Sequence, residues 1–262
     1  MMQAPSLDWS IGGYETIAAL LLPAAETVVA AAGLKRGDRV VDIGCGTGNA
    51  ALLAARQGAE VIGVDPALRL IEVAAERAAR EGVQASFRQG EAASLPIPDA
   101  SMDVAISVFG IIFAGDAAAA IAEIDRVLTA PARIVLSAWL PRGAVFEMNA
   151  AAAAAVRAAV GAPPPPAFNW NDRDELTRLL QPYGFTLSTE EHELAFTATS
   201  ARDFLEEQSR DHPLAVAGLG LLAKFGRAER VRSDLLDILE KGNEDATAFR
   251  ATSRYIVAVA HR

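Results

Sequence analysis

The chain of 262 residues has few of the residues that build metal sites, disulfides or nucleic-acid surfaces. It contains one cysteine and three histidines, which excludes a disulfide within the chain and argues against a Cys/His metal site. Its 24 Lys and Arg residues are outnumbered by 33 Asp and Glu residues, so the formal charge is −9. Binding to phosphate backbones needs clustered basic residues, and the sequence therefore predicts no nucleic-acid partner.

Long apolar runs are also missing. The best candidate, from Ile17 to Ala25, contains Pro23 and stops at Glu26, well short of the ~20 residues that a membrane span needs. The first residues show neither the basic region nor the apolar core of a signal peptide. We expect a cytoplasmic protein that does not enter a membrane, as a monomer or homodimer.

What the chain does have is a hydrophobic fraction of 52%, enough for a packed core. In the first half, β-branched runs alternate with segments of helical composition. The expected strands cover residues 39–43, 60–64, 85–89, 102–108 and 133–139, and the expected helices cover 49–57, 68–80 and 117–128. Strands that alternate with helices in this way predict a parallel sheet with helices on both faces.

The second half changes character. It predicts an alanine-rich helix over 143–160, a stiff extended loop at Pro163–Pro166 and a helix over 172–181 with Asp172 and Glu175 at its start. One long strand or a hairpin is expected over 185–197, and a final strand over 255–260. Two or three helices, the first opened by Ser200 and Asp203, fill the chain between them. A mostly helical insertion thus separates the last two strands.

The most informative segment runs from Val40 to Asn49 and reads V-V-D-I-G-C-G-T-G-N. It follows a strand and opens a helix, where glycines permit a tight turn and free N–H groups attract an anion. Asn49 stands where the nicotinamide fingerprint G-x-G-x-x-G has its third glycine. Asp42 would repel a pyrophosphate and suits a ligand with an ammonium group and a positive sulfur. Alternatively, Asp42 only fixes the turn.

A second acid stands at the end of the next strand. Asp65 follows Gly48 by 17 residues, at the place where a carboxylate accepts hydrogen bonds from ribose hydroxyls. The competing interpretation is an N-cap for the helix that starts near Leu68. Asp42, the glycines and Asp65 together are much more specific than any one of them.

With these residues the sequence resembles the class I S-adenosylmethionine-dependent methyltransferases, in particular the ubiquinone/menaquinone-methyltransferase-like group. The loop D-I-G-C-G-T-G and the strand V-I-G-V-D are similar to its first two motifs. Residues 87–92, 95–103 and 123–128 resemble three further segments. The resemblance covers residues 9–140 well and extends weakly to the end of the chain. It implies a Rossmann-like, doubly wound, seven-stranded and mostly parallel sheet, with the last strand antiparallel between the fifth and sixth.

The resemblance also implies a domain organisation and a cofactor site. The N-terminal helical lid would be residues 1–36, the core 37–198 and 251–262, and the helical substrate cap 199–250. S-adenosylmethionine is the implied cofactor, with its methionine part on the glycine backbone, its amino group near Asp42 and its ribose on Asp65. Pro66 would lie against the adenine, and Glu91 would accept its exocyclic amine. The full set of implied cofactor-binding residues is Tyr14, Asp42, Gly44, Cys45, Gly46, Asn49, Asp65, Pro66, Gly90, Glu91, Ala92 and Ser107.

The predicted activity is transfer of a methyl group to a small molecule by in-line displacement, which depends on positioning. The segment after the fourth strand lacks the N/D-P-P-Y/F motif and is apolar, which favours an apolar or aromatic acceptor. The candidate pocket residues are Phe109, Phe113, Trp139, Phe146 and Trp170. No catalytic residue is evident; His212 is a weak candidate for a base, and no metal ligands are predicted. The alternatives are a nicotinamide-dependent oxidoreductase and a non-catalytic subunit that binds the cofactor.

Overall fold

The computed structural model describes residues 8–163 and 168–262. The extended loop predicted for Pro163–Pro166 lies outside these residues except for Pro163. The chain divides into two compact units. The sheet unit comprises residues 21–139, 167–192 and 255–262, and the helical unit comprises 1–20, 140–166 and 193–254.

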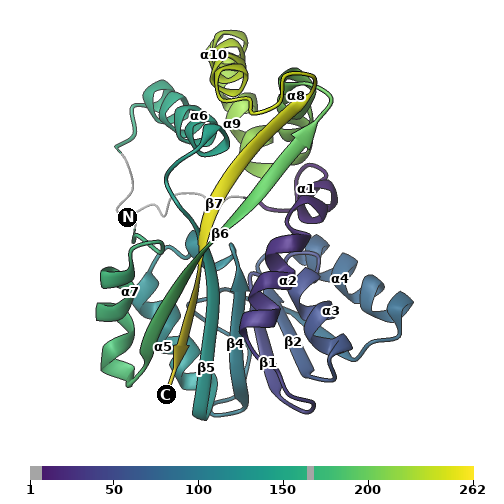
Figure 1. Cartoon of the computed structure of the whole chain (residues 1–262), viewed down its shortest axis with the longest axis vertical. Helices are drawn as coiled ribbons and strands as arrows, with labels where there is room; N and C mark the ends of the chain where they lie inside the picture. Colours follow the sequence, from purple (N-terminus) through teal and green to yellow (C-terminus); the bar gives the residue numbers. More distant parts are fainter. Residues whose placement is uncertain (1–7, 164–167) are drawn as a thin grey trace. The chain divides into compact units, whose positions relative to one another are not determined.

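Seven strands form one sheet in the order β3-β2-β1-β4-β5-β7-β6 (Figure 1). The strands are β1 Arg39–Ile43, β2 Glu60–Asp65, β3 Ala85–Gln89, β4 Met102–Val108, β5 Leu128–Trp139, β6 Thr186–Ala198 and β7 Phe249–His261. The first five pair in parallel, and β7 runs antiparallel to β5. The predicted fold class is confirmed, including the position of the last strand between the fifth and sixth.

The central strands are apolar because both of their faces are covered. Val40, Val41 and Val104 are fully buried in β1 and β4. Helices α2 Leu22–Ala31, α3 Asn49–Arg56 and α4 Leu68–Glu81 pack against the strands of the sheet unit. Helices α5 Ala117–Val127 and α7 Arg173–Leu180 pack against each other. Short 3-10 turns follow β4 at Ile111–Phe113 and α7 at Gln181–Tyr183.

The helical unit holds the remaining helices. These are α1 Tyr14–Leu20, α6 Ala144–Val160, α8 Ala201–Asp211, α9 Pro213–Lys224 and α10 Ala228–Lys241. Helices α8, α9 and α10 form the predicted insertion between the last two strands. Both predicted helix starts are present, since the Asp172 side chain accepts from the N–H groups of Asp174 and Glu175, and Ser200 Oγ accepts from the N–H of Asp203.

The last strand is longer than the sequence predicts. The prediction starts at Tyr255, whereas β7 starts at Phe249. Phe249, Ala251 and Ser253 are buried and alternate with exposed or half-buried residues, which is a strand pattern that the shorter apolar run 255–260 conceals. Of the segment 185–197, the residues from Thr186 onward lie in one long strand, β6, and do not form a hairpin.

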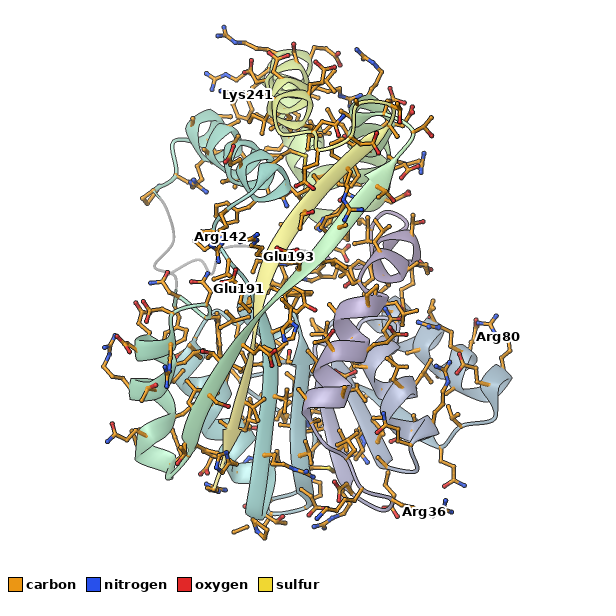
Figure 2. All side chains as sticks on the ribbon, viewed as in Figure 1. Arg36, Arg80, Arg142, Glu191, Glu193 and Lys241 are labelled. Atoms are coloured by element: carbon orange, nitrogen blue, oxygen red, sulfur yellow. The ribbon has the colours of Figure 1, made fainter. Side chains whose placement is uncertain are left out.

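Charged side chains lie on the outside of both units. Arg36 and Arg80 of the sheet unit and Lys241 of the helical unit are exposed (Figure 2). In the part of the chain that the structure describes, no single helix is both long and apolar enough to cross a membrane. Helices α1 and α2 pass that test only when they are taken together.

Candidate functional site

The glycine turn predicted from the sequence joins β1 to α3 at the carboxyl edge of the sheet. Gly44 has a φ of +67° and lies directly against Gly110, the second residue after β4. A Cβ on Gly44 would stand 2.7 Å from the Gly110 Cα, and a Cβ on Gly110 would stand 2.8 Å from the Gly44 Cα. The two loops therefore touch backbone to backbone, which only glycine permits at both positions.

Asp65 is built into this turn. Its Oδ2 accepts the N–H of Gly46 at 2.9 Å, and its Oδ1 accepts the N–H of Ala67 at 2.9 Å. Asp65 is buried, and burial raises its pKa, although both hydrogen bonds lower it. The helix-cap interpretation does not hold in its simple form, since the N-cap of α4 is Ala67. The carboxylate instead joins the end of β2 to the glycine turn.

Asp42 lies beneath the same turn and is also buried. Its Oδ2 accepts the N–H of Ala51 in α3 at 2.9 Å, whereas its Oδ1 has no hydrogen-bond partner among the described residues. Burial raises the pKa of Asp42 to about 7, and the neighbouring Asp65 adds a smaller repulsion. The carboxylate thus has one unused oxygen that a cation or a hydrogen-bond donor would satisfy.

Most amides of the glycine turn itself are hydrogen-bonded within the protein. The amides of Gly44 and Cys45 donate to the Val64 carbonyl, Gly46 donates to Asp65, and Gly48 donates to the Cys45 carbonyl. Two buried carboxylates and few available donors disfavour a pyrophosphate. The turn fits a ligand that is neutral or positive where it meets Asp42.

Several other predicted cofactor residues gather at this edge. Gly90 donates its N–H to the Asp65 carbonyl at 3.1 Å, and Glu91 and Ala92 follow it. The Pro66 carbonyl accepts from Gln89 Nε2. Ser107 Oγ donates to the Ile43 carbonyl at 2.6 Å and accepts the N–H of Ile111 at 2.9 Å. The structure thus brings these residues to the carboxyl ends of β1 to β4.

Arg77 is a residue that the sequence prediction missed. Its Nη1 on α4 donates to the Thr47 carbonyl at 2.7 Å, to Thr47 Oγ1 and to Asn49 Oδ1 at 2.9 Å. One guanidinium therefore holds both ends of the segment where the turn becomes α3. The Asn49 side chain is thus hydrogen-bonded within the protein. Nothing in the sequence of α4 distinguishes Arg77 from the other charged residues of that helix, so this contact was not predictable.

The predicted acceptor-pocket residues fall into separate groups. Phe109 stacks on Trp139 with ring centroids 3.8 Å apart, and Tyr255 meets the Phe109 ring edge-on at 5.4 Å. Phe113 is 50% exposed, and Trp170 is buried against Phe168.

Phe146 and Tyr14 belong to the helical unit, and each can be described only there. Phe146 lies in α6. Tyr14 lies in α1, with its ring edge-on to Trp9 at 6.3 Å.

Phe109 has a strained backbone, with a φ of +55°. Its N–H donates to Ser137 Oγ at 3.1 Å, and Ser137 is fully buried on β5 beside β4. This bond and the stacking on Trp139 hold the ring where the chain leaves the sheet. Ser137 is a second residue that sequence reasoning did not identify.

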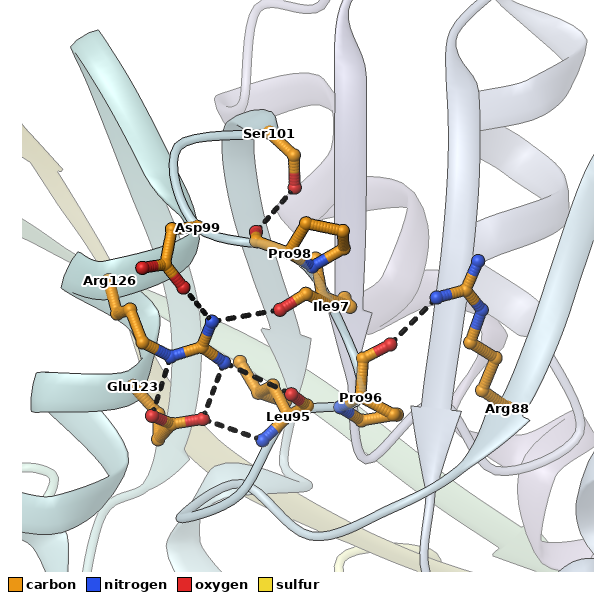
Figure 3. Close-up of polar contacts among 9 residues, drawn as sticks. All are labelled: Arg88, Leu95, Pro96, Ile97, Pro98, Asp99, Ser101, Glu123 and Arg126. Atoms are coloured by element: carbon orange, nitrogen blue, oxygen red, sulfur yellow. Dashed lines mark hydrogen bonds and ion pairs between the residues drawn. The ribbon is translucent and has the colours of Figure 1, made fainter.

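Hydrogen bonds join two of the segments that carry the family resemblance, residues 95–103 and residues 123–128. Arg126 on α5 donates to the carbonyls of Leu95 and Ile97 and to the carboxylates of Asp99 and Glu123 (Figure 3). Glu123 Oε2 in turn accepts the N–H of Leu95 at 2.8 Å. Arg126 and Glu123 together hold residues 95–99, which follow Glu91, against helix α5.

We expect Arg126→Lys to lower the free energy of unfolding by about 1–3 kcal/mol, since an ammonium cannot reach this set of carbonyls and carboxylates. Urea unfolding followed by circular dichroism measures the effect. Arg80→Lys, at an exposed position on α4, is the matched control and should change stability by less than about 0.5 kcal/mol. Equal, small effects of both changes would contradict this role for Arg126.

His212 differs from a solvated loop residue. It lies in the helical unit between α8 and α9, where its Nδ1 accepts the N–H of Leu214 at 3.2 Å. Burial lowers the pKa of His212 to about 4, so the ring is neutral near pH 7. The described residues contain no group of three or more His, Cys, Asp or Glu side chains arranged to hold a metal ion.

The chain is similar in sequence to several known proteins. Residues 40–130 match the family described as "Methyltransferase domain". The protein Rv1405c of Mycobacterium tuberculosis is 35% identical over 173 residues, 66% of this chain and 63% of that protein. A malonyl-[acyl-carrier protein] O-methyltransferase of Serratia marcescens is 30% identical over 146 residues, 56% of this chain and 55% of the enzyme. The matches to these relatives thus span less than two thirds of their lengths.

The fold agrees as well. The crystal structure of YcgJ from Bacillus subtilis has a TM-score of 0.63 and 20% identity, covering 92% of this chain and 98% of that one. Residues 40–130 therefore resemble a methyltransferase domain, and the sheet has the Rossmann-like fold that the sequence predicts. The ubiquinone/menaquinone-like subgroup stays a prediction.

Proposed function

We propose that the protein is an S-adenosylmethionine-dependent methyltransferase that acts on a small, apolar or aromatic molecule. The observation that carries the proposal is the unpaired Oδ1 of Asp42, buried beneath a glycine turn whose amides are largely used within the protein. A ligand with an ammonium group satisfies this oxygen, whereas a pyrophosphate meets two carboxylates. The methyltransferase relatives support the same assignment.

Different residues at the carboxyl edge of the sheet would bind different parts of the cofactor. The glycine turn would hold the methionine part, with Asp42 taking the amino group directly or through water. Asp65 keeps lone pairs beyond its two backbone bonds and would accept the ribose hydroxyls, Pro66 would lie against the adenine, and Glu91 would accept the adenine's exocyclic amine. When bound, S-adenosylmethionine supplies an activated methyl group. The protein must then place the acceptor in line and exclude water, which can lower the barrier by ~7–11 kcal/mol at best.

The acceptor would lie against the stacked rings of Phe109 and Trp139 in the sheet unit. Phe109 and Trp139 stand at the ends of β4 and β5, next to Ser107, so an apolar or aromatic acceptor fits them. The helical insertion 199–250 would set the acceptor specificity, because the parallel strands already supply the cofactor residues. We also propose a cytoplasmic monomer or homodimer without nucleic-acid partners, in line with the charge of −9.

Titration calorimetry tests the assignment directly. We expect S-adenosylmethionine and S-adenosylhomocysteine to bind, and NADH not to bind. Tighter binding of NADH than of S-adenosylmethionine would contradict the proposal and favour the oxidoreductase alternative. Cofactor binding without methyl transfer to any acceptor in a broad panel would favour a non-catalytic subunit.

Asp65→Asn should weaken binding of S-adenosylhomocysteine about 10- to 150-fold, since hydrogen bonds to a charged group contribute ~1.5–3 kcal/mol. Asparagine keeps an acceptor for one of the N–H groups of Gly46 and Ala67, whereas alanine would leave both without one. Glu60→Gln, at the exposed start of the same strand, is the control. Unchanged affinity in the Asp65→Asn protein would show that Asp65 serves only the turn.

A further inference from the structure

Helix α3 begins without a capping side chain of its own. Its N-cap is Gly48, at a φ of +86°, so no side chain at that position can accept an N–H group of the first turn. The Asp42 carboxylate of β1 takes this role, because its Oδ2 accepts the N–H of Ala51, the third residue of the helix, at 2.9 Å. A displacement of this first turn would therefore move or release Asp42.

The same turn is also held by Arg77 of α4. The atom Nη1 alone donates to the Thr47 carbonyl at 2.7 Å, to Thr47 Oγ1 at 3.1 Å and to Asn49 Oδ1 at 2.9 Å. Thr47 precedes the N-cap and Asn49 follows it, so these bonds hold the chain on both sides of Gly48. Since Nη1 carries only two hydrogens, at least one of them is shared between acceptors.

Helix α4 lies against the turn because Gly48 has no side chain. A Cβ on Gly48 would stand 3.2 Å from the Ala74 Cβ and 3.3 Å from the Phe87 ring. Ala74 and Arg77 are three residues apart and therefore share one face of α4. Arg77 is half-buried on this face, and burial lowers its pKa, although a guanidinium stays charged at neutral pH.

These contacts converge on Asp42. Its Oδ1 has no hydrogen-bond partner among the described residues, and the direction of that oxygen depends on the bond from Ala51 to Oδ2 of the same carboxylate. The bonds of Arg77 go to Thr47 and Asn49, so Arg77 acts on Asp42 through the first turn of α3.

We propose that Arg77 is a positioning residue for the cofactor. By holding the first turn of α3, it keeps Asp42 Oδ1 in the place where that oxygen binds the ammonium group of S-adenosylmethionine. The inference rests on the proposed function, which assigns the ammonium group to Asp42. The adenosine part would bind at Asp65 and Glu91, so loss of Arg77 should affect only ligands that carry the amino-acid part.

S-adenosylhomocysteine and 5′-methylthioadenosine are the probes, because only the first carries the amino-acid part. In titration calorimetry, Arg77→Met should weaken S-adenosylhomocysteine binding about 2- to 12-fold, the effect of one hydrogen bond, and leave methylthioadenosine binding unchanged. Arg77→Lys should recover part of the loss, because an ammonium group can replace a single donor nitrogen. Arg80→Met, at an exposed position on the same helix, is the matched control and should change neither affinity.

The Asp42→Asn background shows whether Arg77 acts through Asp42. There, Arg77→Met should cause less than about a 2-fold further loss of S-adenosylhomocysteine affinity, because the contact that Arg77 positions is already weakened. An equal loss in both backgrounds, equal weakening of both ligands, or full affinity of the Arg77→Met protein for S-adenosylhomocysteine would overturn the proposal.

A measurement on the ligand-free chain separates this inference from the proposed function. Arg77→Met should speed hydrogen exchange of the Ala51 amide at least about 2-fold, and Arg80→Met should not. Arg77→Lys gives a smaller increase and replaces Arg77→Met in all measurements if that variant does not fold. Binding of neither probe by the native chain would refute the proposed function and, with it, the role of Arg77 in cofactor binding. Unchanged exchange at Ala51 would refute the inference alone.

Discussion

Between pH 4 and pH 7 the ligand-free protein should lose up to about 4 kcal/mol of stability through Asp42 alone. Burial raises the pKa of Asp42 from its ordinary 3.8 to about 7, and each pKa unit corresponds to 1.36 kcal/mol. In this range the folded protein holds a proton on Asp42 that the unfolded chain has released. Raising the pH therefore favours unfolding, until the folded carboxyl has also ionised and the loss is complete above pH 7.

Urea unfolding at half-unit pH intervals compares the native chain with Asp42→Asn, which cannot titrate. The difference in unfolding free energy between the two should change steadily from pH 4 to pH 7 and then stay constant. Asp103→Asn is the control of opposite sign, because Arg39 lowers the pKa of Asp103 to about 2. A difference between the native chain and Asp42→Asn that is independent of pH would refute the assigned pKa.

Gly44→Ala should destabilise the protein by about 2–5 kcal/mol. The left-handed backbone, at a φ of +67°, costs an L-residue ~1–2 kcal/mol, and the new methyl group would stand 2.7 Å from the Gly110 Cα. Backbone atoms cannot rotate away as a flexible side chain does, so the ends of β1 and β4 must separate. Overpacking of this kind typically costs a further ~1–3 kcal/mol.

Gly37→Ala provides a matched control for the backbone contribution. Gly37 also has a positive φ, +86°, but no atom of the described residues lies within 4 Å of the position that an alanine methyl group would take there. This variant should lose only the conformational ~1–2 kcal/mol. Thermal and urea unfolding of the two alanine variants separate strain from steric overlap. Equal losses would show that the contact between the two loops relaxes without cost.

The glycine turn and the hydrogen bonds of Arg126 and Glu123 to residues 95–99 affect the same part of the molecule. Both position backbone at the carboxyl edge of the sheet, where open α/β sheets bind their ligands. The turn depends on Gly44 meeting Gly110, and the loop depends on Arg126 and Glu123. Variants of Arg126 and Glu123 are expected to change ligand affinity only through the position of this loop, whereas Gly44 belongs to the proposed cofactor site itself.

The local sequence determined the elements and the outline of the site. The β-branched runs, the glycine turn at 44–48 and the acids at 42 and 65 each depend on residues near one another in the chain, so their geometry follows from local rules. The helix starts at Asp172 and Ser200 were predictable for the same reason. The order of the strands came from the resemblance to a family, because pairing between distant segments has no local signature.

Tertiary structure alone decided the contacts that join distant segments. Asp42 has a raised pKa, and its Oδ1 has no hydrogen-bond partner among the described residues, because neighbouring strands and helices bury the side chain. The contact of Gly44 with Gly110 spans 66 residues, and the bonds of Arg126 to loop 95–99 span about 30. Hydrogen bonding and burial are properties of neighbours in space, and the sequence names these residues without showing which of them meet.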